Sequence, residues 1–334
     1  MTYEKTKTFL NEKGQEQLLR FYDELEETGK NRLLSEIEKI DWSFEEVLNN
    51  PEDLSGKNRR IEPIEGLRLE EIELRKGEFR KAGLRALQEG KVAAVLLAGG
   101  QGTRLGVDGP KGAYDIGITH PLYIFEQQMK NLLEVVKECG TYIPLYIMTS
   151  EKNDAETKSF WKEQGYFGYP ENEVHFFVQD MAPAVDFDGK IFLEEKDKPA
   201  LSPNGNGGWF SSLHRAGLCK DLHKRGVEWI NIYAVDNVLQ RIADPVFVGA
   251  TLLAGVNCGA KVVCKACPEE RVGVLCKEDG QPAIIEYYEL TKEMADSREA
   301  DGSLSYLYGV ILNYLFSLKK LEEIAGSRIP VHIV

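Results

Sequence analysis

Cysteine, proline, long apolar runs and positive charge are all scarce in this chain of 334 residues. Six cysteines and 13 prolines are too few for a small disulfide-stabilised fold or for a proline-rich disordered polymer. The longest strongly apolar run ahead of a glycine pair is Val92–Ala98, far short of the ~20 residues that cross a bilayer. We therefore expect an ordinary globular protein with no membrane span and no membrane partner.

Positive charge is outnumbered by negative charge. The chain has 41 lysines and arginines against 54 aspartates and glutamates, which gives a formal net charge of -13. Non-specific affinity for nucleic acid comes mainly from basic residues that neutralise phosphates, so DNA or RNA is excluded as a main partner. A phosphate bound here would have to be held by a few local cations. The N-terminal residues mix both signs of charge without an apolar core, so we expect no secretory signal and a cytoplasmic location.

Four of the six cysteines lie close together in the sequence, and Cys264 and Cys267 form one C-x-x-C pair. Structural zinc sites usually show two close pairs of ligands. The pattern therefore favours reduced thiols that bind no metal.

Charge density and composition change near residue 90. Residues 1–90 contain 21 acidic and 16 basic residues, and apolar residues between positions 18 and 40 recur at the three- and four-residue spacing of amphipathic helices. Glycines and β-branched runs become common only after Lys91. We therefore predict an N-terminal helical region over 1–90 and a second domain over 91–334, with no indication of oligomeric state.

Short apolar runs alternate with helical patterns in the second domain. Such alternation predicts an α/β fold with a doubly wound, largely parallel sheet, in which ligands bind beyond the carboxyl ends of the strands. The expected strands are Val92–Ala98, Ile143–Met148, Val174–Gln179, Trp229–Val235, Ala260–Cys264, Val272–Cys276 and Ala283–Tyr287. The expected helices are Leu122–Glu138, Ala155–Gln164, Gly208–Leu218 and Pro245–Leu253.

The loop after the first of these strands has the chemistry of a polyanion site. Glycines there let the backbone turn sharply and bring its N–H groups near a phosphate chain. Arg104 and Lys111 add positive charge. The loop is not a Walker A motif, because no G-K-[ST] ends it, and it is not G-x-G-x-x-G. A dinucleotide dehydrogenase would also need an acidic residue at the end of the second strand, where this chain has Met148, Thr149 and Ser150.

The loop does match another spacing, L-x2-G-G-x-G-T-R-L-G-x3-P-K, at ten positions: Leu96, Gly99, Gly100, Gly102, Thr103, Arg104, Leu105, Gly106, Pro110 and Lys111. On this motif the chain resembles the UDP-sugar pyrophosphorylases, and within them the UDP-N-acetylhexosamine pyrophosphorylase branch. The resemblance implies a Rossmann-like, GT-A-like nucleotidyltransferase sheet behind a helical arm. It also implies a uridylyltransferase that converts UTP and a sugar 1-phosphate, most favourably N-acetylglucosamine 1-phosphate, to a UDP-sugar and pyrophosphate.

The resemblance assigns roles in the same order along the chain. It implies that Arg104 and Lys111 are catalytic, and that Asp236, at the end of an apolar strand, holds Mg²⁺ or Mn²⁺. Gln179 and Pro183 match the uracil-reading segment, Gly205 and Asn206 the sugar loop, and Gly273 and Glu286 two sugar-facing segments. The full set of expected UTP and UDP-sugar contacts is Leu97, Ala98, Gly99, Gly100, Gly102, Thr103, Gln179, Pro183, Gly205, Asn206, Gly273, Glu286 and Asn313.

The chain departs from the family pattern at four places. Asn204 stands where the family usually has Asp, Val310 replaces an asparagine that contacts the sugar, and after Gly117 the short stretch Ile118–Leu122 replaces a longer, more basic one. Relatives also continue into a second phosphate-binding lysine and a small C-terminal domain, which this sequence does not contain. Two alternatives follow: a uridylyltransferase for another sugar, glucose 1-phosphate first because of Val310, and a nucleotide-binding homologue without turnover.

Overall fold

The computed structural model describes residues 1–42, 44–45, 59–106 and 109–325. These residues fall into two compact units. The described residues of the first unit lie within Met1–Lys57 and Gln179–Gly208, and those of the second within Asn58–Val178 and Trp209–Arg328. The units thus divide the chain differently from the composition step near residue 90, because the first unit takes in a segment far along the chain.

The first unit combines short helices with two small sheets. Its elements are α1 (Tyr3–Glu12), α2 (Glu27–Lys39), the antiparallel pair β5 (Met181–Pro183) and β8 (Leu201–Pro203), and the pair β6 (Leu193–Glu195) and β7 (Lys198–Pro199). Its core contains Leu10, Leu18, Leu33, Ile37 and Ile40 from the N-terminal part, packed with Ile191. The N-terminal helices therefore bury their apolar faces against the 179–208 segment.

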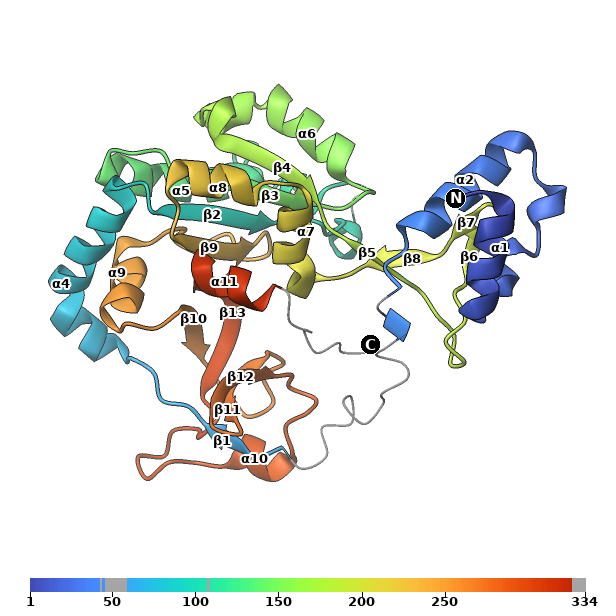
Figure 1. The fold of residues 1–334 in the computed structure, drawn as a ribbon. Coiled ribbons are helices and arrows are strands. Elements are labelled where there is room, and N and C mark those ends of the chain that lie inside the picture. The colour runs from blue at the N-terminus through green and yellow to red at the C-terminus, as the bar shows by residue number, and fades with distance from the viewer. Residues whose placement is uncertain (43, 46–58, 107–108, 326–334) are drawn as a thin grey trace. The chain divides into compact units, whose positions relative to one another are not determined.

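The second unit is built on one large mixed sheet (Figure 1). Four neighbouring strands are parallel, in the order β9 (Trp229–Ala234), β2 (Val92–Leu97), β3 (Leu145–Thr149) and β4 (Val174–Val178). The predicted doubly wound α/β fold is confirmed in this part. Beyond β9 the sheet continues antiparallel through β13 (Tyr308–Ser317), β10 (Cys258–Cys264), β11 (Val274–Glu278), β12 (Gln281–Ile285) and β1 (Ile61–Pro63).

Helices cover both faces of the parallel strands (Figure 1). One core cluster joins the sheet to α4 (Leu69–Gln88), α5 (Ile124–Cys139), α6 (Asp154–Glu163) and α9 (Pro245–Leu253). The opposite cluster joins it to α7 (Trp209–Arg215), α8 (Cys219–Arg225) and α11 (Leu318–Ile324). A short helix, α10 (Lys292–Asp296), follows β12. Because β2 has apolar neighbours on both faces, all six of its residues are buried.

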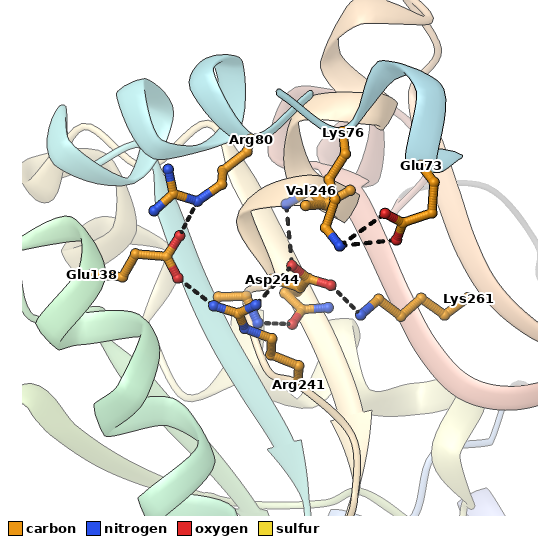
Figure 2. Close-up of polar contacts among 10 residues, drawn as sticks. Glu73, Lys76, Arg80, Glu138, Arg241, Asp244, Val246 and Lys261 are labelled. Atoms are coloured by element: carbon orange, nitrogen blue, oxygen red, sulfur yellow. Dashed lines mark hydrogen bonds and ion pairs between the residues drawn. The ribbon is translucent and has the colours of Figure 1, made fainter. Parts of the chain in front are cut away.

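Two helices distant in sequence, α4 and α9, cross closely at a pair of glycines. A Cβ on Gly83 would lie 1.8 Å from the carbonyl oxygen of Pro245, and a Cβ on Gly249 would lie 1.8 Å from that of Phe79. Ion pairs lie around this crossing, including Arg80 with Glu138 of α5 (Figure 2). Helix α4 is therefore an integral part of the second unit.

All six cysteines are free thiols. Within the described residues, the structure contains no helix with the length and apolarity needed to cross a membrane.

Candidate active site

The glycine loop after β2 folds back on itself. Gly102 N donates to the carbonyl of Gly109 (2.9 Å) and Lys111 N donates to the carbonyl of Gly100 (3.3 Å). Gly109 has a φ of +120°, and a Cβ there would meet the Glu156 carboxylate at 2.6 Å, so only glycine fits this turn without rearrangement. These bonds fix the chain at the carboxyl end of β2.

A buried side chain that the motif does not include supports this loop. Asn153, at the start of α6, is fully buried and donates from Nδ2 to the carbonyls of Ala98 (2.9 Å) and Gly100 (3.2 Å). Its Oδ1 accepts from the Ser150 N–H at 2.8 Å. The signal in the sequence that could have indicated this support is an asparagine four residues after the second strand, just ahead of the next helix.

The predicted catalytic lysine and the predicted metal-binding carboxylate form an ion pair. Lys111 begins a 3₁₀ turn, Lys111–Ala113, and its Nζ contacts Oδ1 of Asp236, which follows β9. The pair forms because β2 and β9 are parallel neighbours, with Leu97 opposite Ala234, so both loops leave the sheet at the same edge. The Asp236 side chain is 66% exposed and that of Lys111 26% exposed, so both are accessible to a ligand.

The other loop residues differ in exposure. Leu97, Ala98 and Gly102 are buried, whereas Gly100 and Thr103 are exposed and Gly99 is half-buried. Arg104 lies in the 3₁₀ turn Thr103–Leu105, and its side chain is outside the described part of the structure. Gly100 and Thr103, and in part Gly99, are therefore the residues among these that are open to a ligand.

Three positions from the segments predicted to face the sugar come together on the antiparallel extension of the sheet. A Cβ built on Gly273 would lie 3.0 Å from Val310 Cγ2 and 3.8 Å from Glu286 Oε1. Gly273 precedes β11, Glu286 follows β12, and Val310 lies on β13. Gly273, which has no side chain, thus lies between the carboxylate of Glu286 and the apolar side chain of Val310. Glu286 is exposed, so it is open to a hydroxyl donor.

The segments predicted to bind uracil and sugar come together in the first unit. Pro183 and Met181 pair with Leu201 and Pro203 across β5 and β8, which brings the 179–183 and 203–206 segments side by side. Gln179 is 6% exposed, whereas Gly205, with a φ of +75°, and Asn206 are exposed.

Asn313 is the predicted contact that lies deepest. It is fully buried on β13, where its Oδ1 accepts from Asn231 (2.9 Å) and its Nδ2 donates to Gln240 (3.1 Å). A direct contact between Asn313 and a ligand would require neighbouring residues to move.

The side chains at this edge suit a divalent cation that is bound by both the protein and the phosphates of a substrate. The described residues contain no group of three or more His, Cys, Asp or Glu side chains that could hold a metal. Mg²⁺ commonly uses one or two protein carboxylates together with substrate phosphates. Asp236 offers one such carboxylate, and the Lys111 ammonium already contacts it as a cation. The residues present therefore fit a magnesium ion.

Comparison with known proteins agrees with this geometry. The family model for UTP--glucose-1-phosphate uridylyltransferase matches residues 41–326. UDP-N-acetylhexosamine pyrophosphorylase-like protein 1 of Homo sapiens is 40% identical over 96% of this chain and 67% of its own length. UDP-N-acetylglucosamine pyrophosphorylase of Saccharomyces cerevisiae is 35% identical over 98% of this chain and 73% of its own length.

A solved structure gives the same result. The uridine diphosphate N-acetylglucosamine pyrophosphorylase of Trypanosoma brucei, in complex with an inhibitor, superposes with a TM-score of 0.83 at 28% identity, covering 95% of this chain and 66% of that one. The chain thus spans about two thirds of the length of these relatives.

The chain therefore belongs to the UDP-sugar pyrophosphorylase family, which confirms the resemblance found in the glycine loop. Within the family it is a nucleotidyltransferase of the UDP-N-acetylglucosamine pyrophosphorylase type.

Proposed function

We propose that this chain transfers the uridylyl group of UTP to a sugar 1-phosphate and releases pyrophosphate. An oxygen of the sugar phosphate would attack the α-phosphorus of UTP. The bond between that phosphorus and the oxygen bridging to the β-phosphate would break, and pyrophosphate would leave with the electron pair. Such a displacement needs positioning and charge neutralisation, and no protein nucleophile.

The observation that carries this proposal is the pairing of Lys111 with Asp236 beside the exposed glycine-loop backbone. In a protein with a net charge of -13, these groups create a local site for a polyphosphate. The N–H groups of Gly99, Gly100 and Thr103 would contact phosphate oxygens. Lys111 would neutralise charge near the α-phosphate, and Arg104 would do so on the departing pyrophosphate. Mg²⁺ or Mn²⁺ held by Asp236 would polarise and neutralise phosphate oxygens.

We propose N-acetylglucosamine 1-phosphate as the preferred acceptor, on the names of the human, yeast and trypanosome relatives. Glu286, Gly273 and Asn206 would orient its hydroxyls, while Gln179 and Pro183 would bind the uracil of UTP. Glucose 1-phosphate is the second candidate, because Val310 lies beside Gly273 and cannot donate a hydrogen bond to an acetamido oxygen.

Pyrophosphate release tests the proposal. The purified chain would be incubated with UTP, Mg²⁺ and, in turn, the 1-phosphates of N-acetylglucosamine, N-acetylgalactosamine, glucose and galactose. We expect the N-acetylated sugars to give the highest kcat/KM. Binding of UTP without release of pyrophosphate from any acceptor would instead identify a nucleotide-binding homologue.

A further inference from the structure

The 234–243 segment joins β9 to α9 and carries Asp236. The side chain of Asp236 is largely exposed, so packing around the carboxylate does not fix its position. What fixes the backbone of the segment therefore determines where the carboxylate stands.

Three side-chain amides, those of Asn231, Asn313 and Gln240, connect the two ends of this segment. The Ala243 N–H donates to Asn231 Oδ1 (2.7 Å), and Asn231 Nδ2 donates to Asn313 Oδ1 (2.9 Å). Asn313 Nδ2 then donates to Gln240 Oε1 (3.1 Å), and Gln240 Nε2 donates to the carbonyl of Ala234 (2.9 Å). We call these three residues the amide chain. Its hydrogen bonds connect the backbone of Ala234 to that of Ala243, and so link the two ends of the segment.

The amide chain is buried, and its hydrogen bonds all run in the same direction from donor to acceptor. Asn231 and Asn313 are fully buried and Gln240 is 6% exposed. Each amide accepts with its oxygen from the preceding group and donates with its nitrogen to the next. Turning any one amide over would bring two donors or two acceptors together, and an unsatisfied buried polar group is costly. The arrangement therefore specifies a single geometry for the segment.

Helix α5 and a set of ion pairs hold the same segment from outside. Gln128 donates to the Ala234 carbonyl (3.1 Å), and Asn131 donates to the carbonyls of Val238 (2.9 Å) and Gln240 (3.1 Å). Figure 2 shows Arg241 reaching Glu138 of α5. These ion pairs are partly exposed and contribute little individually, so the stronger constraints are the buried side-chain amides, which are those of the amide chain and of Gln128.

Backbone strain occurs at two residues next to the amide chain. Ala243, which donates to Asn231 at one end of it, has a φ of 50°, and Leu312, which precedes the central Asn313, has a φ of 52°. Residues other than glycine persist in this region only where the surrounding structure determines their conformation. The bond to Asn231 supplies such a constraint at Ala243.

We propose that Asn231, Asn313 and Gln240 are positioning residues that set the location of Asp236 for metal and phosphate binding, and that Asn313 acts in this way without touching the sugar. This inference rests on the proposed function, because it takes Asp236 as the metal-binding carboxylate. It differs from the role that resemblance implied for Asn313.

Substitution of Asn313 tests the positioning role. Asn313→Asp keeps an acceptor for Asn231 and places an oxygen against Gln240 Oε1, and Asn313→Ala removes both bonds. We expect Mn²⁺ affinity of the protein–UTP complex, measured by electron paramagnetic resonance, to fall about 10-fold or more. The KM for the sugar 1-phosphate should stay within about twofold, because no sugar contact is lost.

Two further measurements separate positioning from general destabilisation. Leu132→Ala removes a fully buried side chain from α5 in the same core, and it should leave Mn²⁺ affinity unchanged. Hydrogen exchange of the Ala243 N–H in the metal-free protein should accelerate in the Asn313 variants and not in Leu132→Ala.

Two results would overturn the proposal. One is a raised KM for the sugar 1-phosphate with unchanged Mn²⁺ affinity and exchange, which would place Asn313 at the sugar. The other is the same loss of Mn²⁺ affinity in Leu132→Ala. If the wild-type chain released no pyrophosphate, the proposed function would fail, and Mn²⁺ affinity and exchange would still decide the positioning role.

Discussion

At the scale of single residues, the Lys111 ammonium contacts the Asp236 carboxylate at the carboxyl edge of β2 and β9. We expect Lys111→Ala to lower kcat by about two to three orders of magnitude, because removing one preorganised charge from such a site raises the barrier by about 3–4 kcal/mol. Steady-state pyrophosphate release measures this. Lys319→Ala, which removes an exposed lysine on α11, is the matched control. Turnover near that of wild type in Lys111→Ala would rule out the assigned role.

Asn153 is the second residue with a specific expected effect. Asn153→Ala removes the donors to the Ala98 and Gly100 carbonyls. We expect the free energy of unfolding to fall by about 1–3 kcal/mol, since two loop carbonyls lose a partner. The KM for UTP should rise more than the KM for the sugar phosphate, because the loop that Asn153 supports would contact the nucleotide. Denaturant unfolding and steady-state kinetics give these two quantities, and equal changes in both KM values would contradict the expectation.

The sequence predicts some of these residues and not others. Lys111 belongs to the glycine-loop motif and Asp236 follows an apolar strand, so their position at one edge could be inferred from the predicted parallel sheet, in which the carboxyl ends of the strands share an edge. Asn153 bonds to backbone carbonyls, and Asn231 and Gln240 bond to Asn313 and to backbone groups. Such partners leave no pattern in the sequence, because any segment supplies a carbonyl.

At the scale of elements, the crossing of α4 and α9 gives a matched pair of substitutions on one helix. Gly83→Ala would place a methyl group against the Pro245 carbonyl, whereas a Cβ at Gly77 has nothing within 4 Å. We expect Gly83→Ala to destabilise the protein by about 1–3 kcal/mol through overpacking. Gly77→Ala should stabilise it by about 0.5–1 kcal/mol through helix propensity. Thermal and denaturant unfolding would show the opposite signs, and similar values for both variants would contradict this packing.

A second element-scale prediction concerns pH and the contact of α8 with β3 and β4. His175 stacks on Tyr146 with ring centroids 5.0 Å apart, and Arg225 Nη2 lies 3.3 Å from its Nε2. Burial lowers the pKa of His175, Arg225 lowers it further, and Asp221 opposes both effects. The unfolded chain therefore binds a proton at a higher pH than the folded chain, so stability falls as pH drops below about 6.5.

We expect the wild-type melting temperature to fall more between about pH 7.5 and 5.5 than that of His175→Gln, which carries no titratable group there. Differential scanning fluorimetry at several pH values checks this. Parallel pH profiles for the two proteins would mean that His175 is not the group responsible.

The positions of the parallel strands along the chain could largely be predicted from the sequence. The pairing of strands in the sheet could not. The apolar runs gave β2, β3, β4 and β9 to within a few residues, because a buried parallel strand is continuously apolar. The antiparallel placement of β13 next to β9 depends on contacts between residues far apart in the chain, and local hydrophobic patterns carry no such information.

At the scale of the whole molecule, each compact unit contains some of the residues predicted to bind substrate. Gln179, Pro183, Gly205 and Asn206 lie in the first unit, and the glycine loop, Asp236, Gly273 and Glu286 lie in the second. Composition alone placed a boundary near residue 90, because it could not show that residues 179–208 share a core with the N-terminal helices.

The prediction at this scale concerns which sugar 1-phosphate the protein prefers. Val310→Asn would restore an amide beside Gly273 and Glu286. We expect this variant to raise the ratio of kcat/KM for N-acetylglucosamine 1-phosphate over glucose 1-phosphate by about 10-fold, since one hydrogen bond discriminates by about 1.4 kcal/mol. Competition between the two acceptors measures the ratio. An unchanged ratio would show that position 310 does not face the acetamido group.

The central claim is that the site formed by Lys111 and Asp236, at the carboxyl edge of β2 and β9, catalyses uridylyl transfer. Its most direct test is pyrophosphate release from UTP and N-acetylglucosamine 1-phosphate as a function of Mg²⁺, in the wild-type chain and in Asp236→Asn. We predict Mg²⁺-dependent release by wild type, with UDP-N-acetylglucosamine formed in equal amount, and a loss of about two to three orders of magnitude in Asp236→Asn. Equal release by both proteins, or no release by either, would contradict the claim.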